Sequence, residues 1–245
     1  MTPRSTIAFF GSSLVSTYWN DTATYFRGIL GLLNKRNFKI VFYEPDLLQR
    51  QQNRDIENPE YAEVVVYSPD EKETIACLQE AMKSDVIIKT SRVGALDAQI
   101  ETFILKNRTS EQLIFFWDVN SPVTLDRLIS DKEDYFHSLI PYFDHILTSG
   151  GGQKVIDMYC KFGAKKVTPI YPGYSPETHF PVEANPDYEA DLAFLGDRLT
   201  ALEGRVDEFF FRVAKALPDR KFILGGIGWE EKEMPENVLY IGHVP

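Results

Sequence analysis

Two strand-to-helix turns in this sequence carry residues that could hold a phosphate or a sugar. Each follows an apolar run, and the residues are Gly11, Ser12 and Ser13 in the first turn and Ser149, Gly150 and Gly151 in the second. Backbone N–H groups of such turns, with the N-terminus of the next helix, bind anions. Consecutive glycines also let the backbone approach a ligand or an opposing domain closely. A plain strand-to-helix connection explains the first turn equally well.

An aromatic side chain and a carboxylate stand beside turns of this kind. Trp19 offers an aromatic face that suits a sugar ring, although burial in the core would explain it too. Asp118 follows the apolar run 112–116, at the carboxyl end where parallel sheets bind ligands. We interpret Asp118 as a catalytic or acceptor-binding carboxylate. Capping of the next helix by Asp118 or Ser121 is an equal alternative.

A second set of turns lies towards residue 245, and its candidate ligand-binding residues are Gly196, Arg198, Gly226, Trp229 and His243. The three turns follow three apolar runs, so we expect them at one edge of a sheet. Arg198 can make bidentate contacts with a diphosphate. The alternative for Arg198 is an ion pair with Asp197 or Glu203.

Several classes of function are disfavoured by composition and by missing motifs. The chain has no GxSxG, Walker, HExxH or GxGxxG motif. Its formal charge is 26 − 36 = −10, which disfavours nucleic acid as a partner. No apolar run approaches the roughly 18 residues of a transmembrane segment. The two cysteines, Cys77 and Cys160, are not spaced as metal ligands, so we expect no bound metal. We expect both to be buried thiols of a cytoplasmic protein.

Apolar runs alternate with helical patterns along the chain, which predicts an α/β fold with a parallel sheet. The expected strands are 6–10, 39–43, 62–67, 85–89, 112–116, 144–148 and 165–171. The expected helices are 22–35, 70–82, 95–106 and a segment ending at 162. Asp21 is the expected cap of the first helix. The polar stretch 45–61 is expected to be a long functional loop.

The sequence divides into two Rossmann-like domains joined by a proline-rich linker. We predict an N-terminal domain over 1–171, a linker over 172–188 and the start of a second domain over 189–245. The second pattern has strands at 191–195, 221–224 and 237–241 and an amphipathic helix at 201–217. These elements are too few to cover both faces of a parallel sheet. We therefore expect residues 1–245 to be a fragment that is inactive by itself.

Six segments resemble the CgeB-like glycosyltransferases, a family named after a spore-maturation protein. The segments are 7–13, 42–46, 50–55, 116–118, 194–198 and 224–229. In addition, residues 170–181 are similar to the interdomain crossing of family-4-type retaining glycosyltransferases. The usual aspartate of that crossing is replaced by Ser175.

This resemblance implies a GT-B fold, in which two Rossmann-like domains face each other. The N-terminal domain would hold an acceptor of unknown identity, and the second domain would bind a nucleotide-sugar donor as substrate. Such enzymes normally need no metal or other cofactor. The resemblance places Gly196 and Arg198 near the diphosphate and His243 at the nucleobase side. A non-catalytic sugar- or nucleotide-binding protein and a GT-B epimerase or phosphorylase remain alternatives, because fold does not determine function.

Overall fold

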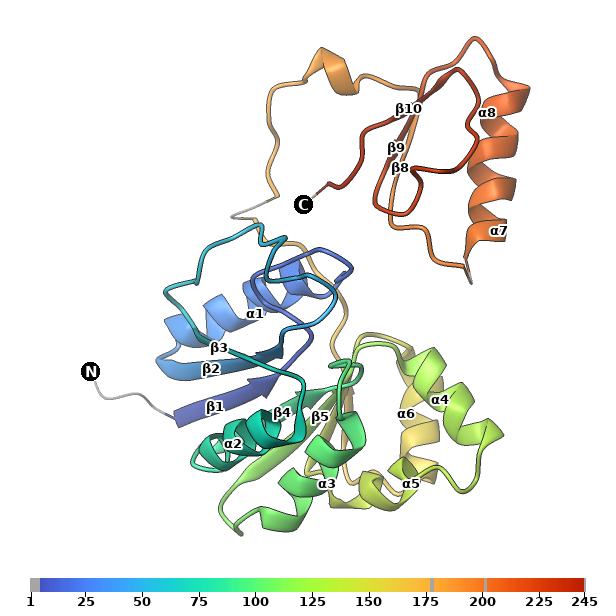
Figure 1. Cartoon of the computed structure of the whole chain (residues 1–245). Coiled ribbons are helices and arrows are strands. Elements are labelled where there is room, and N and C mark those ends of the chain that lie inside the picture. The colour runs from blue at the N-terminus through green and yellow to red at the C-terminus, as the bar shows by residue number, and fades with distance from the viewer. Residues whose placement is uncertain (1–4, 177–178, 201, 245) are drawn as a thin grey trace. The chain divides into compact units, whose positions relative to one another are not determined.

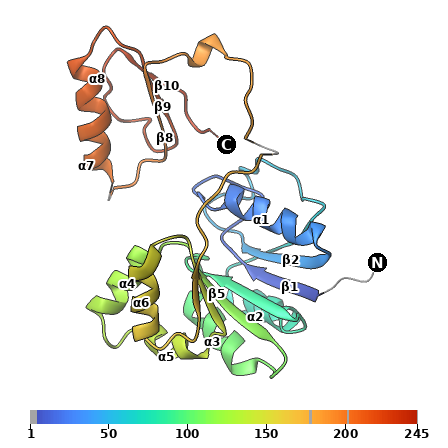
Figure 2. The ribbon, with the colours of Figure 1, turned by 180° about the vertical axis from the view of Figure 1, so that it is seen from behind.

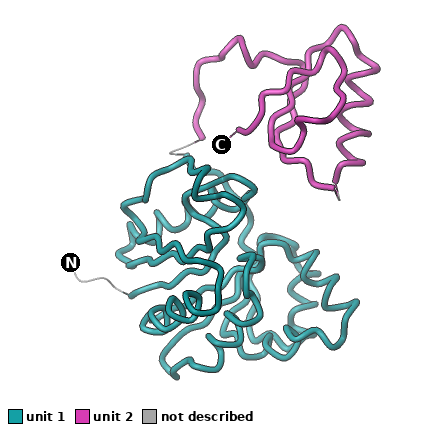
Figure 3. Tube along the Cα trace, viewed as in Figure 1, with its two compact units in different colours: residues 1–178 teal, residues 179–245 magenta. Residues whose placement is uncertain are grey.

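The chain forms two compact units in a computed structural model that describes residues 5–176, 179–200 and 202–244. Unit 1 is Met1–Thr178 and unit 2 is His179–Pro245 (Figure 3). The boundary falls inside the predicted linker, of which Glu177 and Thr178 lie outside the described residues. Each unit has its own sheet and its own core.

Unit 1 contains a seven-stranded sheet in which all neighbouring strands are parallel (Figure 1). The strand order is β3-β2-β1-β4-β5-β6-β7. The strands are β1 Ser5–Phe10, β2 Phe38–Pro45, β3 Glu63–Tyr67, β4 Val86–Thr90, β5 Leu113–Asp118, β6 His145–Thr148 and β7 Val167–Pro169. The predicted parallel α/β fold is confirmed, and the order changes direction between β1 and β4.

Helices cover both faces of this sheet (Figures 1 and 2). They are α1 Ala23–Lys35, α2 Glu71–Ala81, α3 Asp97–Asn107, α4 Ser121–Ser130, α5 Phe136–Leu139 with the 3₁₀ turn η1 Ile140–Tyr142, and α6 Gly152–Lys161. On one face Phe26 and Leu30 of α1 pack against Phe9 and Trp117. The helices α2 to α6 pack on the other face. Helix α2 connects β3 to β4, and α3, α4 and α6 follow β4, β5 and β6.

Two local predictions in unit 1 are wrong. Helix α1 is capped by Thr22, which makes no side-chain cap hydrogen bond, and Asp21 is exposed. Cys160 is also exposed rather than buried, because it lies on the outer side of α6, whose Tyr159 faces the core. The long segment from Asp46 to Ala62 contains no helix or strand, as predicted.

Unit 2 contains a three-stranded parallel sheet of order β10-β9-β8. Its strands are β8 Leu192–Leu195, β9 Phe222–Gly225 and β10 Val238–Tyr240, preceded by the 3₁₀ turn η2 Pro186–Tyr188. The predicted helix 201–217 forms as α7 Glu203–Val206, a π-helical turn η3 Asp207–Phe211 and α8 Arg212–Ala216, and Ala201 lies outside the described residues. The π turn lets the adjacent Phe210 and Phe211 both reach the core.

Candidate functional site

The carboxyl edge of the unit 1 sheet is the part of unit 1 best suited to ligand binding. Strand order reverses between β1 and β4, and parallel sheets bind ligands beyond the carboxyl ends at such a point. Strained backbone gathers there: positive φ angles occur at Trp19 (48°), Leu48 (56°), Gln49 (58°), Arg92 (60°) and Leu96 (53°). These residues lie in the loops after β1, β2 and β4. Strain of this kind persists only where surrounding contacts enforce it, often at binding sites.

The loop after β1 is built from internal contacts of its predicted site residues. A Cβ atom at Gly11 would lie 2.4 Å from the ring of Phe42, so the close approach of that ring requires glycine. Ser12 donates from its hydroxyl to Asn20 Oδ1 at 2.8 Å. Ser13 is buried and donates to Glu44 Oε1 at 3.1 Å. Gly11 and Ser13 therefore shape the loop, whereas Ser12 is half-buried and Trp19 is 36% exposed.

Arg50 holds this loop from behind, a role that the sequence patterns did not reveal. Its guanidinium donates to the backbone carbonyls of Ser12, Tyr18 and Trp19 at 3.2, 3.3 and 2.8 Å. The pKa of Arg50 is lowered, mainly by burial. The nearby Glu44 opposes this shift and Arg92 adds to it. The only signal in the sequence was an arginine within the long polar segment that follows β2.

We predict that Arg50→Ala lowers the free energy of unfolding by about 2–3 kcal/mol, because hydrogen bonds to charged groups are individually strong. It should also speed amide exchange across residues 12–20. Arg54→Ala is the matched control, since Arg54 contacts Gln51 and Asn58 at the surface and should cost less than about 1 kcal/mol. Urea denaturation and hydrogen exchange measure both quantities. Equal behaviour of the two variants would contradict the assigned role.

Asp118 is fully buried, and its carboxylate already has four donors. Oδ1 accepts from Ser91 Oγ and Thr124 Oγ1, both at 2.9 Å, and from the backbone N–H of Asn120 at 3.1 Å. Oδ2 accepts from the Tyr159 hydroxyl at 2.5 Å. Burial first, and then Asp118, raise the pKa of Tyr159 well above its ordinary value. In this structure Asp118 joins the loop after β4 to β5, α4 and α6, and its role as an acceptor-binding carboxylate stays a prediction.

The glycine turn after β6 has left-handed backbone at every glycine. The φ angles of Gly150, Gly151 and Gly152 are 92°, 91° and 61°. A Cβ atom at Gly151 would lie 2.3 Å from Val155 Cγ2, so a side chain has no room there. The N–H of Ser149 donates to the Asp118 carbonyl at 2.9 Å, which fixes the turn to β5. The turn thus lies at the same sheet edge as the other predicted site residues of unit 1.

Buried polar atoms without partners also occur at this edge. In the described part of the chain, Thr17 Oγ1, Trp117 Nε1 and Ser121 Oγ are inaccessible and have no hydrogen-bond partner. Thr17 belongs to the loop after β1, and Trp117 and Ser121 flank the end of β5. Buried polar groups in folded proteins are nearly always paired. Unsatisfied groups at this edge favour it as a place where water or a ligand is bound.

The turns of unit 2 pack so tightly that glycine is obligatory. Gly226 has a φ angle of 122°, and a Cβ atom there would lie 2.2 Å from the carbonyl oxygen of Gly196. The indole N–H of Trp229 donates to that same oxygen at 2.8 Å. Trp229 is fully buried, so it supports the turn and has no surface for a donor ligand, contrary to the sequence prediction. His243 is exposed.

Arg198 forms an ion pair with Glu203, which is the alternative given above for this residue. Its Nη2 lies 2.8 Å from Glu203 Oε1, and its guanidinium lies over the Trp229 ring at 5.9 Å. The Glu203 hydrogen bond raises the pKa of Arg198, so the guanidinium stays charged. The side chain is 31% exposed. A phosphate that binds Nη2 of Arg198 would therefore share or replace the Glu203 carboxylate.

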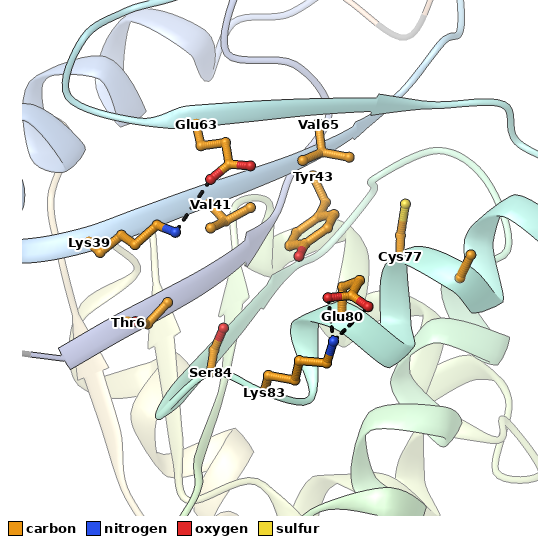
Figure 4. Close-up of a pocket in the computed structure, with 11 residues that line it drawn as sticks. Thr6, Lys39, Val41, Tyr43, Glu63, Val65, Cys77, Glu80, Lys83 and Ser84 are labelled. Carbon is orange, nitrogen blue, oxygen red and sulfur yellow. Dashed lines mark hydrogen bonds and ion pairs between the residues drawn. The ribbon is translucent and has the colours of Figure 1, made fainter.

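An open hollow of about 500 Å³ lies elsewhere in unit 1, between α2 and the strands β1 to β3 (Figure 4). Val41, Tyr43 and Val65 contribute apolar side chains, and the ion pairs Lys39–Glu63 and Lys83–Glu80 line its polar part. It reaches the amino ends of β1 and β2 and contains none of the predicted site residues. We place the candidate site at the carboxyl edge instead, because loops from several strands converge there.

The described residues form neither a metal site nor a membrane-spanning helix. No group of three or more His, Cys, Asp or Glu side chains is arranged to hold a metal ion. No helix among these residues has the length and apolar character needed to cross a membrane. His145 Nε2 lies 2.8 Å from Thr168 Oγ1, and His137 Nε2 lies 2.9 Å from the Leu128 carbonyl, so both histidines have structural contacts.

The architecture is similar to that of several solved structures. An alpha-glucosyltransferase bound to UDP-glucose and DNA containing an abasic site superposes with a TM-score of 0.59 at 11% identity, over 98% of this chain and 67% of that one. HepE of Anabaena, in complex with UDP and glucose, gives 0.57 at 13% identity, over 99% and 70%. The chain has a GT-B-type fold.

A UDP-glucose:anthocyanidin 3-O-glucosyltransferase in complex with UDP shows the same fold, with a TM-score of 0.55 at 10% identity, over 100% of this chain and 73% of that one. The chain spans 58% and 56% of two further alpha-glucosyltransferase structures that contain UDP and DNA. No protein-family model matches the chain, and no curated protein matches it in sequence. At these identities the comparisons establish the fold alone.

Proposed function

We propose that this chain is part of a glycosyltransferase that moves a hexosyl group from a nucleotide-sugar donor to an acceptor. One observation carries the proposal: two parallel sheets have glycine-shaped turns at their carboxyl edges, within a fold shared with UDP-sugar glucosyltransferases. Within that superfamily we assign it to the CgeB-like group, on the sequence resemblance. The donor diphosphate would lie at the Gly196, Arg198 and Gly226 turns, and the acceptor at the carboxyl edge of unit 1.

The chemistry follows from this assignment. Transfer of a sugar creates negative charge on the departing diphosphate, and a fixed cation beside backbone N–H groups stabilises that charge. We assign the role of this cation to Arg198. No metal or redox cofactor is required in the proposal. Nucleic acid is not proposed as acceptor, although the alpha-glucosyltransferase neighbours contain DNA, because the net charge of −10 repels it.

Arg198→Ala tests the donor site directly. We expect the affinity for UDP to fall about ten- to a hundredfold, because charged hydrogen bonds are worth about 1.5–3 kcal/mol. Affinity for uridine should change much less, since uridine lacks the phosphates. Arg205→Ala is the control, as Arg205 is exposed and forms no ion pair in the described part of the chain. Calorimetric titration gives all four affinities, and an unchanged UDP affinity would remove Arg198 from the donor site.

Activity assays separate the proposed transferase from its alternatives. A transferase releases UDP from a UDP-sugar only when the sugar passes to an acceptor or to water. An epimerase converts the UDP-sugar to an isomer with no acceptor, and a binding protein changes nothing. The donor is incubated with and without an acceptor panel, and nucleotide and sugar products are separated by chromatography. Isomerised UDP-sugar without UDP release would refute the transferase proposal.

A further inference from the structure

Two cations converge on a single carboxylate oxygen beside the first turn of unit 2. Arg198 Nη2 lies 2.8 Å from Glu203 Oε1, and Lys232 Nζ lies 2.9 Å from the same oxygen. Lys232 Nζ also contacts Asp207 Oδ1 at 2.7 Å. Two cationic donors on one anionic oxygen is an arrangement that also suits a phosphate oxygen, because phosphate and carboxylate accept the same charged hydrogen bonds.

The Glu203 carboxylate is firmly ionised in this arrangement. The hydrogen bond from Arg198 and then that from Lys232 lower the pKa of Glu203 to about 2. The pKa of Lys232 is raised by Asp207 and Glu203 in turn. At neutral pH all of these groups therefore carry charge, and an incoming anion would compete with Glu203 for both cations.

Both cations also have contacts that do not involve Glu203. The ammonium of Lys232 contacts Asp207 Oδ1 at 2.7 Å and lies 5.5 Å from the centre of the Phe211 ring. The backbone N–H of Lys232 donates to the Trp229 carbonyl at 3.0 Å, and Trp229 holds the Gly196 carbonyl through its indole. The guanidinium of Arg198 lies over the Trp229 ring. Glu203 comes from a different element, the first turn of α7. Both cations would thus retain a contact if the Glu203 side chain rotated away.

Lys232 is also reachable from solvent. Its side chain is 21% exposed and lines a groove of about 330 Å³. Arg212 and Lys215 line the same groove, as do Asp207 and Glu233. Lys232 thus links this groove, which has three cationic side chains, to the Glu203 oxygen that it shares with Arg198.

We propose that Arg198 and Lys232 together bind the phosphates of the donor, and that Glu203, which pairs with both, competes with the phosphates for them. The proposal rests on the proposed function and adds Lys232 and Glu203 to it. Binding of a diphosphate transfers both cations from the Glu203 carboxylate to phosphate oxygens. The exchange replaces one pair of charged contacts by another, so the empty site keeps no unpaired cation.

Calorimetric titration of four variants with pyrophosphate and with UDP tests the proposal. In Glu203→Gln the affinity for both probes should rise about five- to tenfold, because the competing charge is gone. In Lys232→Met it should fall about tenfold, and Lys232→Arg should restore most of it. Glu208→Gln is the matched control, since Glu208 is exposed on the same helical segment and loses the same charge. It should leave both affinities unchanged.

The pyrophosphate results decide this proposal, and the UDP results decide the donor assignment. If Glu203→Gln binds pyrophosphate no better than Glu208→Gln, or Lys232→Met binds it as well as the unmodified chain, Glu203 is not a competitor at a phosphate site. If pyrophosphate responds as expected but UDP binds no tighter than pyrophosphate, the phosphate pair stands and the nucleotide-sugar donor is refuted. Equal urea midpoints among the four variants would show that folding does not cause the differences.

Discussion

Replacement of Lys89 by Met is expected to lower the free energy of unfolding of unit 1 by about 3–5 kcal/mol, because it leaves the buried carboxylate of Glu101 without its cation. Lys89 is fully buried on β4, and its ammonium contacts Asp97, the Thr90 carbonyl at 2.8 Å and Glu101 Oε1 at 2.8 Å. Asp97 in turn accepts from the backbone N–H groups of Val93 and Gly94. The network therefore fixes the loop after β4, at the candidate acceptor edge.

The pH dependence of the Lys89→Met defect follows from the charges left behind. Glu101 is buried, so removal of Lys89 leaves its carboxylate without a cation in a site that disfavours unpaired charge. The defect should therefore be full at neutral pH and smaller in acid, where carboxylates take up protons. In the unmodified chain the carboxylates raise the pKa of Lys89, so its contribution is complete at neutral pH and is lost only in strong alkali.

Urea denaturation followed by circular dichroism at pH 5 and pH 7.5 measures this effect. Lys83→Met is the control, because the Lys83–Glu80 pair is exposed and should contribute less than about 1 kcal/mol. The double change Lys89→Met with Glu101→Gln should recover part of the stability. A loss no larger than that of Lys83→Met, or a double variant worse than the single one, would show that the buried network is not needed.

Gly226→Ala is expected to destabilise unit 2 by about 2–4 kcal/mol, because it combines strained backbone with overpacking. The φ angle of Gly226 is 122°, and the new Cβ would lie 2.2 Å from the Gly196 carbonyl oxygen and 3.0 Å from the Asp197 nitrogen. Both contacts are with backbone, which cannot rotate away as a side chain does. The turns must then separate, and UDP affinity should fall at least tenfold with them.

Gly204→Ala provides the matched control for this substitution. Gly204 lies in α7, and a Cβ atom there would meet nothing within 4 Å. Alanine favours a helix over glycine by roughly 1 kcal/mol, so this variant should be unchanged or slightly more stable. Thermal unfolding and UDP titration of both variants give the comparison. A Gly226→Ala protein with the melting temperature and UDP affinity of Gly204→Ala would contradict the tight packing of the two turns.

Local sequence patterns determined the architecture of this protein. Apolar runs alternating with amphipathic stretches predicted every strand of both sheets to within a few residues, because strands of a helix-covered parallel sheet are rich in apolar residues. The prolines of 172–188 marked the segment that contains the boundary between the units. The consecutive glycines around Gly151 predicted a close backbone approach, and a Cβ atom at Gly151 would indeed lie 2.3 Å from Val155, four residues on.

Only the tertiary structure decided which polar residues hold the site together. Arg50 bonds the carbonyls of a loop more than thirty residues earlier, and Lys89 reaches carboxylates on α3. Asp118 and Trp229 have the residue types of ligand contacts, but neighbouring elements bury them both. Arg198 pairs with Glu203 because the first turn of α7 brings that carboxylate to it. Such partners are chosen by distance in space, which the order of residues along the chain does not encode locally.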